Sequence, residues 1–456
     1  MQDFELESLR SGDAHSQLVK GPPILSDSSS KDCVNLPSST AVSRFKQKIS
    51  YLAIRIMMWP IQWLPYTAIH RLGYLLGHLT YYFLPKFRKR TLSNLSLASD
   101  LNLSPSQIIP IAKASFVNLM ITCLEYPKLI REKEIHKIAT CDNPEIAAEL
   151  MHQKTPVIFF CGHQANWEVL FLEGTKRMPG VAIGRPIANT YLYRWILSMR
   201  EKYGGRIITP QNAIKEGLRA LRKGSFLGIV GDQGRPDSGY SCPFFGRNAW
   251  TSPMPAILSY RTGSPIIVAS TRRIDGKYRI HYSDPIWPNK EKPMEAEIDR
   301  MMRLSLGLLE KSIKLAPEQW LFAHNRWKQQ TLGKIKRPFR QESICIILPT
   351  ERAVFETLHT HLNVFRELYP LEFITLCIPE CFKDAPVPEG IEVRTYASLP
   401  DLKTTDYRFK LVFNFSGDPS IGKHFKKLAA VTTLDLEWTS EKDFPSFLKE
   451  LVCNAP

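Results

Sequence analysis

The stretch FFCGHQANWEVL, residues 159–170, decides how the chain folds, because a histidine follows an apolar run directly and a carboxylate comes five residues later. On a regular helix five residues turn by about 140°, so His163 and Glu168 would face different directions. They can meet only if His163 lies in a turn and Glu168 in the helix beyond it. Residues 157–161 suit a buried strand, and Gly162 permits a sharp exit from it. The pair is therefore predicted at the carboxyl end of a strand, where open α/β sheets bind ligands.

This spacing suits acid–base chemistry. Glu168 could accept a hydrogen bond from one ring nitrogen of His163 and fix its tautomer. It would also stabilise the imidazolium that forms when the other nitrogen takes a hydroxyl proton, which makes His163 a general base. A histidine and a glutamate this close can equally form a structural hydrogen bond or occur together by coincidence, so the spacing alone leaves both interpretations open.

Further sequence blocks accompany the first one, two of them directly after apolar runs that suit strands. They are RTLSNL (90–95), GRPIAN (184–189), GDQ (231–233), PFFG (243–246), EQW (318–320) and HNRWK (324–328). Together with GHQANWE they resemble the blocks of the lipid A late acyltransferases, Gram-negative lauroyl and myristoyl transferases that add a second acyl chain to hydroxyacyl groups. In that family HX4E is the acyltransferase motif, and the resemblance covers roughly residues 45–335.

The resemblance implies a fold and a reaction. The fold class would be α/β, with a mixed sheet flanked by helices as in glycerol-3-phosphate acyltransferases and an anchored N-terminal start. The reaction would move a fatty acyl chain from acyl carrier protein to a hydroxyl of a hydroxyacyl chain on a lipid A precursor, without a metal or cofactor. Gln164-Ala165 and Gly184 depart from the residues usual in the family, which bears on acceptor or chain-length choice and not on the reaction.

The resemblance also implies roles for single residues. Besides His163 and Glu168, Arg185 would stabilise the oxyanion or bind an acceptor phosphate, and Asp232 would orient Arg185 or the acceptor. An N-cap after the strand predicted at 226–230 explains Asp232 equally well. The substrate-binding candidates are Asn166, Asn189, Gln233, Phe244, Phe245 and Arg326.

Phe244, Phe245 and Trp250 lie in a Pro- and Gly-containing segment that predicts a loop, with aromatic side chains lining an acyl channel. Packing over the sheet edge is the alternative, since aromatic residues commonly fill cores. His324 and Arg326 follow a helix-like run at 298–315 and are expected to support the domain.

Composition agrees with a multidomain protein. The 456 residues exceed one typical domain, and the 44% apolar content is ample for a packed core. Nine cysteines are scattered without a CxxC pair, which excludes a metal or disulfide framework of the usual kind.

The N-terminal region divides into two parts. Residues 1–42 are polar and Ser-rich with acidic residues near the start, which predicts a disordered tail and no signal peptide. Residues 43–90 hold basic residues but no Asp or Glu, and two apolar runs at 56–70 and 72–85. Each run is shorter than the roughly 20 residues of a spanning helix, so an interfacial or short anchor on the anionic inner membrane is predicted. A buried helical hairpin is the alternative.

The net charge of +16 and the pI near 9.4 indicate acidic partners. No RNP motif, zinc-ligand set or helix-turn-helix accompanies the basic residues, so nucleic acid is not expected. Anionic lipid, the lipid A precursor and acyl carrier protein fit the charge, with the catalytic part at the cytoplasmic face of the membrane. Basic clusters could bind phosphate or the carrier, or be solvated helix faces. They are Arg194, Arg200, Lys202 and Arg206, and Arg219, Arg222 and Lys223.

The acyltransferase domain at 91–328 and a basic linker at 329–341 leave residues 342–456 unexplained by the family resemblance. Strand-like runs with a helical pattern between the first two predict a small parallel, Rossmann-like α/β domain. It faintly resembles half of a GT-B glycosyltransferase, but no Gly-rich phosphate fingerprint follows its first strand, so a docking or stabilising module is favoured. The predicted strands are 343–348, 372–378, 391–396 and 410–415.

Two classes of function compete: an acyl-transferring membrane enzyme, and a lipid-binding scaffold that has kept the fold. His163, Glu168, Arg185 and Asp232 together favour the enzyme. A glycerolipid acyltransferase, with HX4D instead of HX4E, is the nearest rival within the enzyme class, and the NWE, RPxxN and RWK blocks argue against it. The sequence does not predict the acyl chain length or the hydroxyl that is acylated.

Overall fold

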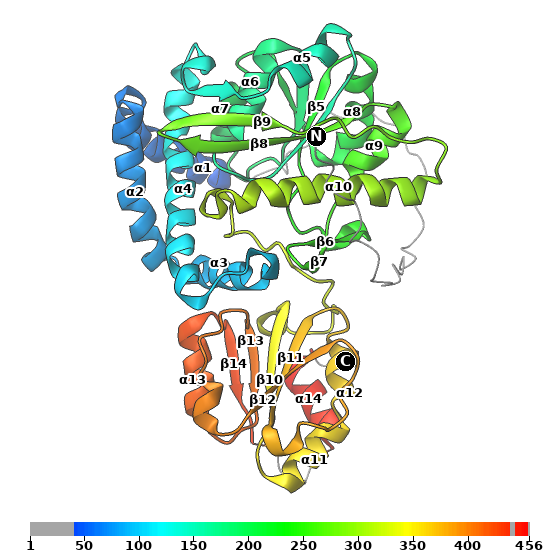
Figure 1. Ribbon diagram of the computed structural model, residues 1–456. Coiled ribbons are helices and arrows are strands. Elements are labelled where there is room, and N and C mark those ends of the chain that lie inside the picture. The colour runs from blue at the N-terminus through cyan, green and yellow to red at the C-terminus, as the bar shows by residue number, and fades with distance from the viewer. Residues whose placement is uncertain (1–40, 438–442, 455–456) are drawn as a thin grey trace, which may run out of the picture.

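The computed structural model describes residues 41–437 and 443–454, which form a layer of long helices, a large mixed sheet and a smaller parallel sheet (Figure 1). Apart from its last two positions, the predicted N-terminal tail lies outside the described residues. The mixed α/β class predicted for the central part is confirmed.

The N-terminal helices begin where prolines fix the backbone. Pro85 and Pro105 occupy the first turns of their helices, and Pro65 precedes another, positions that proline tolerates well. The helix after Pro65 packs along the helix that begins at Pro105 at very close range, since a Cβ atom on Gly77 would lie 2.4 Å from the Cα of Val117. The helices are α1 (Ala41–Met58), α2 (Tyr66–Phe83), α3 (Pro85–Leu97) and α4 (Pro105–Arg131).

The outer face of α1 and α2 leaves large apolar side chains in solvent. Ile56 is 74% exposed and Phe83 is 76% exposed, and the inner face of α2 packs on α4. This one-sided packing differs from the fully buried hairpin considered above. Among the described residues α4 passes the length and composition test for a membrane span, but 44% of its apolar window is buried within the protein. The other exposed large apolar side chains of α1, α2 and the segments next to them are Val42, Phe45, Ile49, Leu52, Met57, Trp59, Trp63, Tyr74, Leu75, Leu79, Tyr82 and Leu84.

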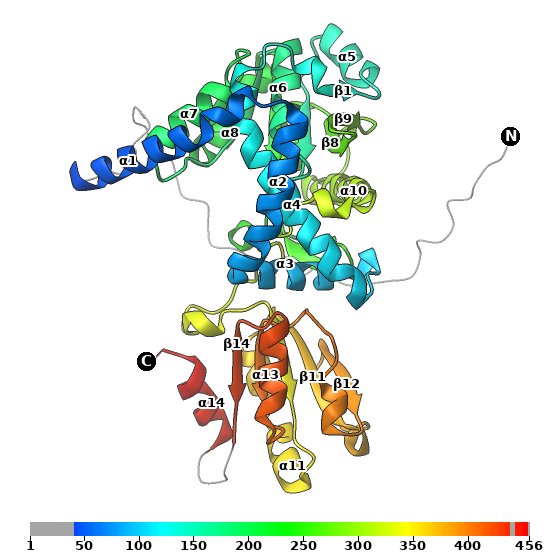
Figure 2. The ribbon, with the colours of Figure 1, turned by 90° about the vertical axis from the view of Figure 1, so that its left-hand side faces the viewer.

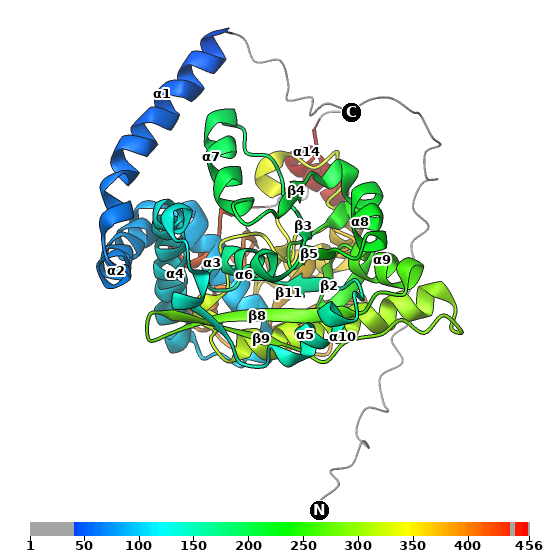
Figure 3. The same cartoon turned by 90° about the horizontal axis from the view of Figure 1, so that it is seen from above.

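The central sheet has seven strands in the order β1-β9-β8-β2-β5-β3-β4. All neighbours are parallel except the hairpin pair β8 and β9. The strands are β1 (Ala139–Cys141), β2 (Ile158–Cys161), β3 (Gly180–Ile183), β4 (Arg206–Ile208), β5 (Phe226–Val230), β8 (Ile266–Ile274) and β9 (Lys277–Tyr282). The helices around them are α5 (Glu145–His152), α6 (Glu168–Arg177), α7 (Thr190–Arg200), α8 (Ala213–Arg222), α9 (Met254–Thr262) and α10 (Met294–Lys314). Viewed from above, helices lie on both sides of the sheet (Figure 3).

The PFFG block forms a β-hairpin with one buried face, so the predicted loop is wrong. Strands β6 (Ser241–Phe244) and β7 (Arg247–Trp250) pair in antiparallel register and enclose a two-residue turn. Phe245 and Gly246 in this turn have φ of 49° and 76°, the positive values that tight hairpin turns require. The sequence offered no Asn-Gly or Asp-Gly signal for it.

The C-terminal sheet is parallel and has five strands in the order β12-β11-β10-β13-β14. The chain starts at the centre and moves outward to both edges. Four strands match the predicted runs, whereas β14 was not predicted, and the expected single helix is broken at His361. The elements are β10 (Ser343–Ile347), α11 (Arg352–Thr360), α12 (Asn363–Leu368), β11 (Phe373–Pro379), β12 (Ile391–Tyr396), β13 (Leu411–Asn414), α13 (Pro419–Leu428), β14 (Thr432–Asp435) and α14 (Phe444–Val452).

The predicted linker is not a free connector. Its first residue, Gln329, accepts a hydrogen bond from Trp250 of the acyltransferase domain (2.8 Å), whereas Ile335 is buried in the core of the C-terminal sheet and pairs with Cys453, so the linker is packed on both domains. A buried polar contact joins the two domains: Lys410, which forms an ion pair with Glu342 of its own domain, donates to the side chain of Asn325 in the acyltransferase domain (3.2 Å). On the helical layer, the Ser93 hydroxyl donates to the carbonyl of Arg408 (2.7 Å).

Candidate active site

The turn after β2 carries His163 at the carboxyl end of the strand, and Glu168 is the first residue of α6, as the spacing predicted. Ala165 has a φ of 48°, which lets the chain reverse between the strand and the helix. Backbone bonds from the EQW block clamp this turn: Ala165 N–H donates to Gln319 (2.6 Å) and Leu321 N–H donates to His163 (3.0 Å). The closing block of the sequence therefore holds the histidine in place.

Asp232 is the carboxylate that binds His163. Its Oδ1 lies 2.6 Å from the ring Nδ1, and its Oδ2 accepts the His163 backbone N–H (2.6 Å). The indole of Trp320 also donates to Oδ2 (2.7 Å). Burial alone would raise the pKa of Asp232, but the bonds and charge of His163 hold it well below its usual range. An ionised Asp232 fixes the proton on Nδ1 and leaves Nε2 as an acceptor.

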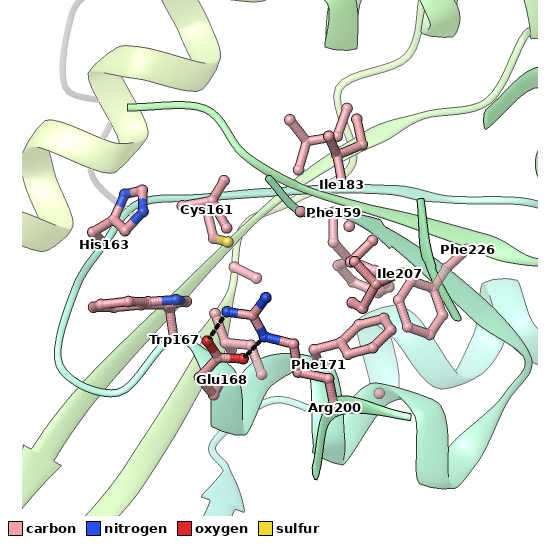
Figure 4. A pocket seen from close by; sticks show the side chains of 18 of the residues that line it. Phe159, Cys161, His163, Trp167, Glu168, Phe171, Ile183, Arg200, Ile207 and Phe226 are labelled. Atoms are coloured by element: carbon pink, nitrogen blue, oxygen red, sulfur yellow. Dashed lines mark hydrogen bonds and ion pairs between the residues drawn. The ribbon is translucent and has the colours of Figure 1, made fainter. Parts of the chain in front are cut away.

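The expected hydrogen bond from His163 to Glu168 is not found among the contacts of the described residues. Arg200, at the end of α7, donates hydrogen bonds to both carboxylate oxygens of Glu168 (Nε to Oε2 2.8 Å, NH2 to Oε1 2.5 Å), as Figure 4 shows. The Tyr126 hydroxyl also donates to Oε1 (2.5 Å). The helical start of α6 gives Glu168 these nearer partners, while Asp232 reaches the imidazole from the end of the neighbouring strand β5. Pairing by sequence proximity was therefore the wrong inference.

A cavity of about 280 Å³ opens beside the histidine. Its mouth carries polar groups, among them His163, Gln233 and Arg185. Its deeper part is lined by aromatic and small residues from the sheet and α6: Phe159, Phe171, Phe226, Tyr282, Gly174, Ala182, Gly228 and Ala269. Figure 4 shows phenylalanine rings and aliphatic side chains converging away from His163. The cavity has the polarity that a fatty acyl chain with a reactive head would need.

Polar residues near Nε2 complete the mouth. The Gln233 amide nitrogen lies 3.3 Å from Nε2 of His163, and the Trp167 ring packs edge-on against the imidazole at 4.7 Å. Arg185 and Arg235 line the same opening and are exposed. Burial raises the pKa of Cys161, also in the lining, which disfavours the thiolate form of its side chain.

Five predicted substrate-binding residues do not line this cavity. Asn166 is buried and donates to Glu125 (2.7 Å), which also accepts from Tyr278 (2.5 Å). Asn189 caps α7 and donates to the carbonyl of Gln47 in α1 (2.8 Å). These side chains hold the scaffold together.

The other three form a buried cluster under the site. Phe244 and Phe245 are fully buried against Trp320, and Arg326 lies over the Phe244 ring at 4.6 Å. The Arg326 guanidinium donates to the Trp250 carbonyl and the Thr251 hydroxyl, each at 2.8 Å. The predicted acyl-channel role of the two phenylalanines is therefore corrected to packing, the alternative given above, whereas Arg326 has the expected supporting role.

Sequence reasoning missed Arg200 and Trp320 as neighbours of the reacting group. Arg200 was noted only as part of a basic cluster, yet it is the last residue of α7 and donates hydrogen bonds to Glu168. Trp320 lies in a recognised block but carried no assigned role. Their importance depends on tertiary contacts across 32 and 88 residues of sequence.

Comparison with known proteins identifies relatives of the part of the chain that forms this site. The profile of the bacterial lipid A biosynthesis acyltransferases matches residues 38–329, more than half of the chain. The chain belongs to this family. It is 24% identical over 309 residues to the lipid A biosynthesis lauroyltransferase of Escherichia coli K12, covering 66% of this chain and 98% of that protein. It is 28% identical over 163 residues to the palmitoleoyltransferase of the same organism, covering 34% of this chain and 50% of that one. The family match ends before the C-terminal sheet.

Proposed function

We propose that this lipid A biosynthesis acyltransferase transfers a fatty acyl chain from acyl carrier protein to the hydroxyl of a hydroxyacyl chain on a lipid A precursor. The observation that carries the proposal is the His163–Asp232 pair at the mouth of an apolar cavity. Asp232 holds Nδ1, so the lone pair of Nε2 faces the opening, where the Gln233 amide lies 3.3 Å away and an acceptor hydroxyl would take its place. That is the arrangement of a general base.

The reaction uses Nε2 of His163 twice. It takes the proton of the acceptor hydroxyl while that oxygen attacks the thioester carbonyl, forming a new C–O bond and an oxyanion. When the intermediate collapses, the C–S bond breaks and the imidazolium returns its proton to the leaving thiolate. Asp232 stabilises the imidazolium in between. The reaction is balanced without metal, cofactor or acyl-enzyme.

The other residues at the mouth of the cavity bind the oxyanion and the acceptor. Gln233 donates from beside Nε2 toward the developing oxyanion, and Arg185 and Arg235 bind acceptor phosphates at the exposed rim. Glu168 acts through Arg200, which it holds against the cavity as a buried ion pair. The fatty chain of the donor occupies the aromatic part of the cavity.

We propose that the exposed apolar face of α1 and α2 lies in the cytoplasmic leaflet of the inner membrane. No Asp or Glu occurs from residue 41 to residue 99, while basic residues flank the apolar positions. Such a helix layer suits an anionic bilayer surface. The C-terminal domain, Rossmann-like in outline, contributes no residue to the cavity and is proposed to be a docking module.

The test is mass spectrometry of a lipid A precursor incubated with the purified protein and a panel of acyl carrier protein thioesters. A mass gain of one acyl group, absent with His163→Ala, is expected. Lysophosphatidic acid offered in parallel distinguishes a glycerolipid acyltransferase, and turnover of that acceptor alone would overturn the proposal. No transfer to either acceptor would favour the scaffold.

A further inference from the structure

Helix α13 of the C-terminal domain carries a basic face, with Lys423 in electrostatic contact with the N-cap carboxylate of Asp418. Lys423, Lys426 and Lys427 are exposed and follow the spacing that places side chains on one side of a helix, whereas Ile421 and Phe425 face the core. We call these three lysines the α13 lysine face. Helix α13 contains no Asp or Glu, and no ion pair within the described residues involves these lysines. A face of this kind attracts an anionic partner.

The α13 lysine face continues the basic end of α3. Lys89 of α3 donates to the carbonyl of Ala430, just beyond α13 (2.7 Å). Burial and the nearby charges of Lys426 and Arg88 lower the pKa of Lys89, so these cations crowd one patch across the domain boundary. Such crowding costs free energy in the isolated protein and is relieved when anions bind.

Exposed apolar and aromatic residues adjoin this patch. Phe83 and Phe87 are exposed at the corner between α2 and α3. Directly beside them Lys113 lies 5.2 Å from the centre of the Tyr82 ring. A sequence of apolar, aromatic and basic groups is the order found where proteins meet a bilayer surface.

The picture places these elements on one side of the molecule. Helices α2 and α13 lie along the same edge in Figure 1, and the view of Figure 2 shows α2, α3 and α13 together on the face turned to the reader. We infer that the C-terminal domain docks on anionic phospholipid headgroups through the α13 lysine face, beside the α1–α2 membrane face. This inference rests on the membrane placement proposed above and gives the added domain a task outside the reaction.

The test footprints lysines of the full chain. Amine labelling and mass spectrometry are run without vesicles, with phosphatidylcholine vesicles, and with vesicles containing phosphatidylglycerol. We expect labelling of the α13 lysine face to fall several-fold only with the anionic vesicles. Lys290, Lys292 and Lys383, which are exposed elsewhere, should label equally in all three. If the protein binds vesicles while the α13 lysine face stays fully reactive, the inference is wrong.

Matched variants measure the contribution to binding. The triple variant Lys423→Gln/Lys426→Gln/Lys427→Gln should lose about tenfold or more of its affinity for anionic vesicles and keep its affinity for neutral ones. The triple variant Lys290→Gln/Lys292→Gln/Lys383→Gln removes the same charge and should bind as the unaltered protein does. Equal loss in both would reduce the effect to net charge and overturn the inference.

Two further arms separate the partner and the underlying proposal. Protection of the α13 lysine face by acyl carrier protein, and not by vesicles, would assign the face to a protein partner and overturn the lipid inference. Acyl transfer in detergent should be unchanged in the first triple variant. A protein that transfers acyl groups in detergent yet binds no vesicles would refute the membrane placement and this inference together, while leaving the reaction standing.

Discussion

The carboxylate of Asp232 binds both the ring and the backbone of His163, with Oδ1 2.6 Å from Nδ1 and Oδ2 2.6 Å from the amide nitrogen. Asp232 therefore fixes the tautomer of the imidazole and the shape of the turn that carries it. The buried indole of Trp320 is a third hydrogen-bond donor to this carboxylate, which restricts its orientation further.

Replacing this carboxylate tests the general-base assignment. We expect Asp232→Asn to lower the rate of acyl transfer by about 100-fold or more, because an amide cannot stabilise the imidazolium and accept all three hydrogen bonds. Single-turnover assays with acyl carrier protein thioester measure the rate, and circular dichroism checks the fold. Asp299→Asn, at a half-exposed ion pair, is the control. A near-normal rate in folded Asp232→Asn would refute the assignment.

The Glu168–Arg200 pair allows structural and catalytic roles to be separated. Arg200→Met should cost about 3 kcal/mol of unfolding free energy, because it leaves Glu168 buried without a counter-charge. The double variant Glu168→Gln/Arg200→Met should regain most of that stability without regaining transfer. Arg352→Met, in an ion pair whose arginine is 73% exposed and whose glutamate, Glu356, is 61% exposed, should cost less than about 1 kcal/mol. A fully active double variant would show that the pair only stabilises the fold.

Gly228 offers a way to alter donor choice. It lines the cavity, and a Cβ atom there would lie 3.4 Å from the Cβ of Ala182, an ordinary contact, so a side chain fits the fold. We expect Gly228→Val to favour a donor chain about two carbons shorter, because the added carbons displace part of the chain. Competition between thioesters of different length measures the preference. Gly307→Val, at an open helix position, should leave it unchanged, and an unchanged preference in Gly228→Val would place the chain elsewhere.

The sequence predicted the positions of the reacting groups better than their partners. Local signals were sufficient for the strand–turn–helix at His163, because apolar runs and Gly162 act over a few residues. The partner of the histidine depends on strand order: β5 lies beside β2 in the sheet, although 64 residues separate the end of β2 from the start of β5 in the sequence. The residues next to Asp232 and Glu168 in the sequence do not indicate which of the two carboxylates contacts His163.

The buried hairpin shows a second limit. Phe244 and Phe245 were expected at the substrate because they stand next to glycine and proline. Their true position depends on a Phe-Gly turn with positive φ at both residues, which is uncommon for phenylalanine and is tolerated because the rings pack against Trp320. Tertiary packing thus overrides the local preference.

The pH dependence of stability tests the environment of His324. Burial lowers the pKa of His324 to about 4 from 6.5, so between those values the unfolded chain binds more protons than the native one. The unfolding free energy therefore falls as the pH drops through this window. His324→Gln should remove the contribution of His324 to this pH dependence. The unfolding free energy of the variant relative to that of the unaltered protein should therefore rise by about 2 kcal/mol from neutral pH to pH 4.5. Urea unfolding across this range measures the difference, and parallel curves would contradict the assigned burial.

Lys410 and Glu342 form a buried ion pair within the C-terminal domain, and both side chains contact Asn325 of the acyltransferase domain. Lys410→Met should cost about 3 kcal/mol, because Glu342 would keep only its hydrogen bond from Asn325 (3.2 Å) in a site closed to water. Lys403→Met removes a half-exposed lysine of the same domain and should cost less than about 1 kcal/mol. Urea unfolding followed by hydrogen exchange around Asn325 measures both.

Acyl transfer in detergent should survive in Lys410→Met, and also in a protein truncated after residue 338, since every residue lining the cavity comes from the acyltransferase domain. A soluble truncated protein without any transfer would instead show that the C-terminal domain completes the site.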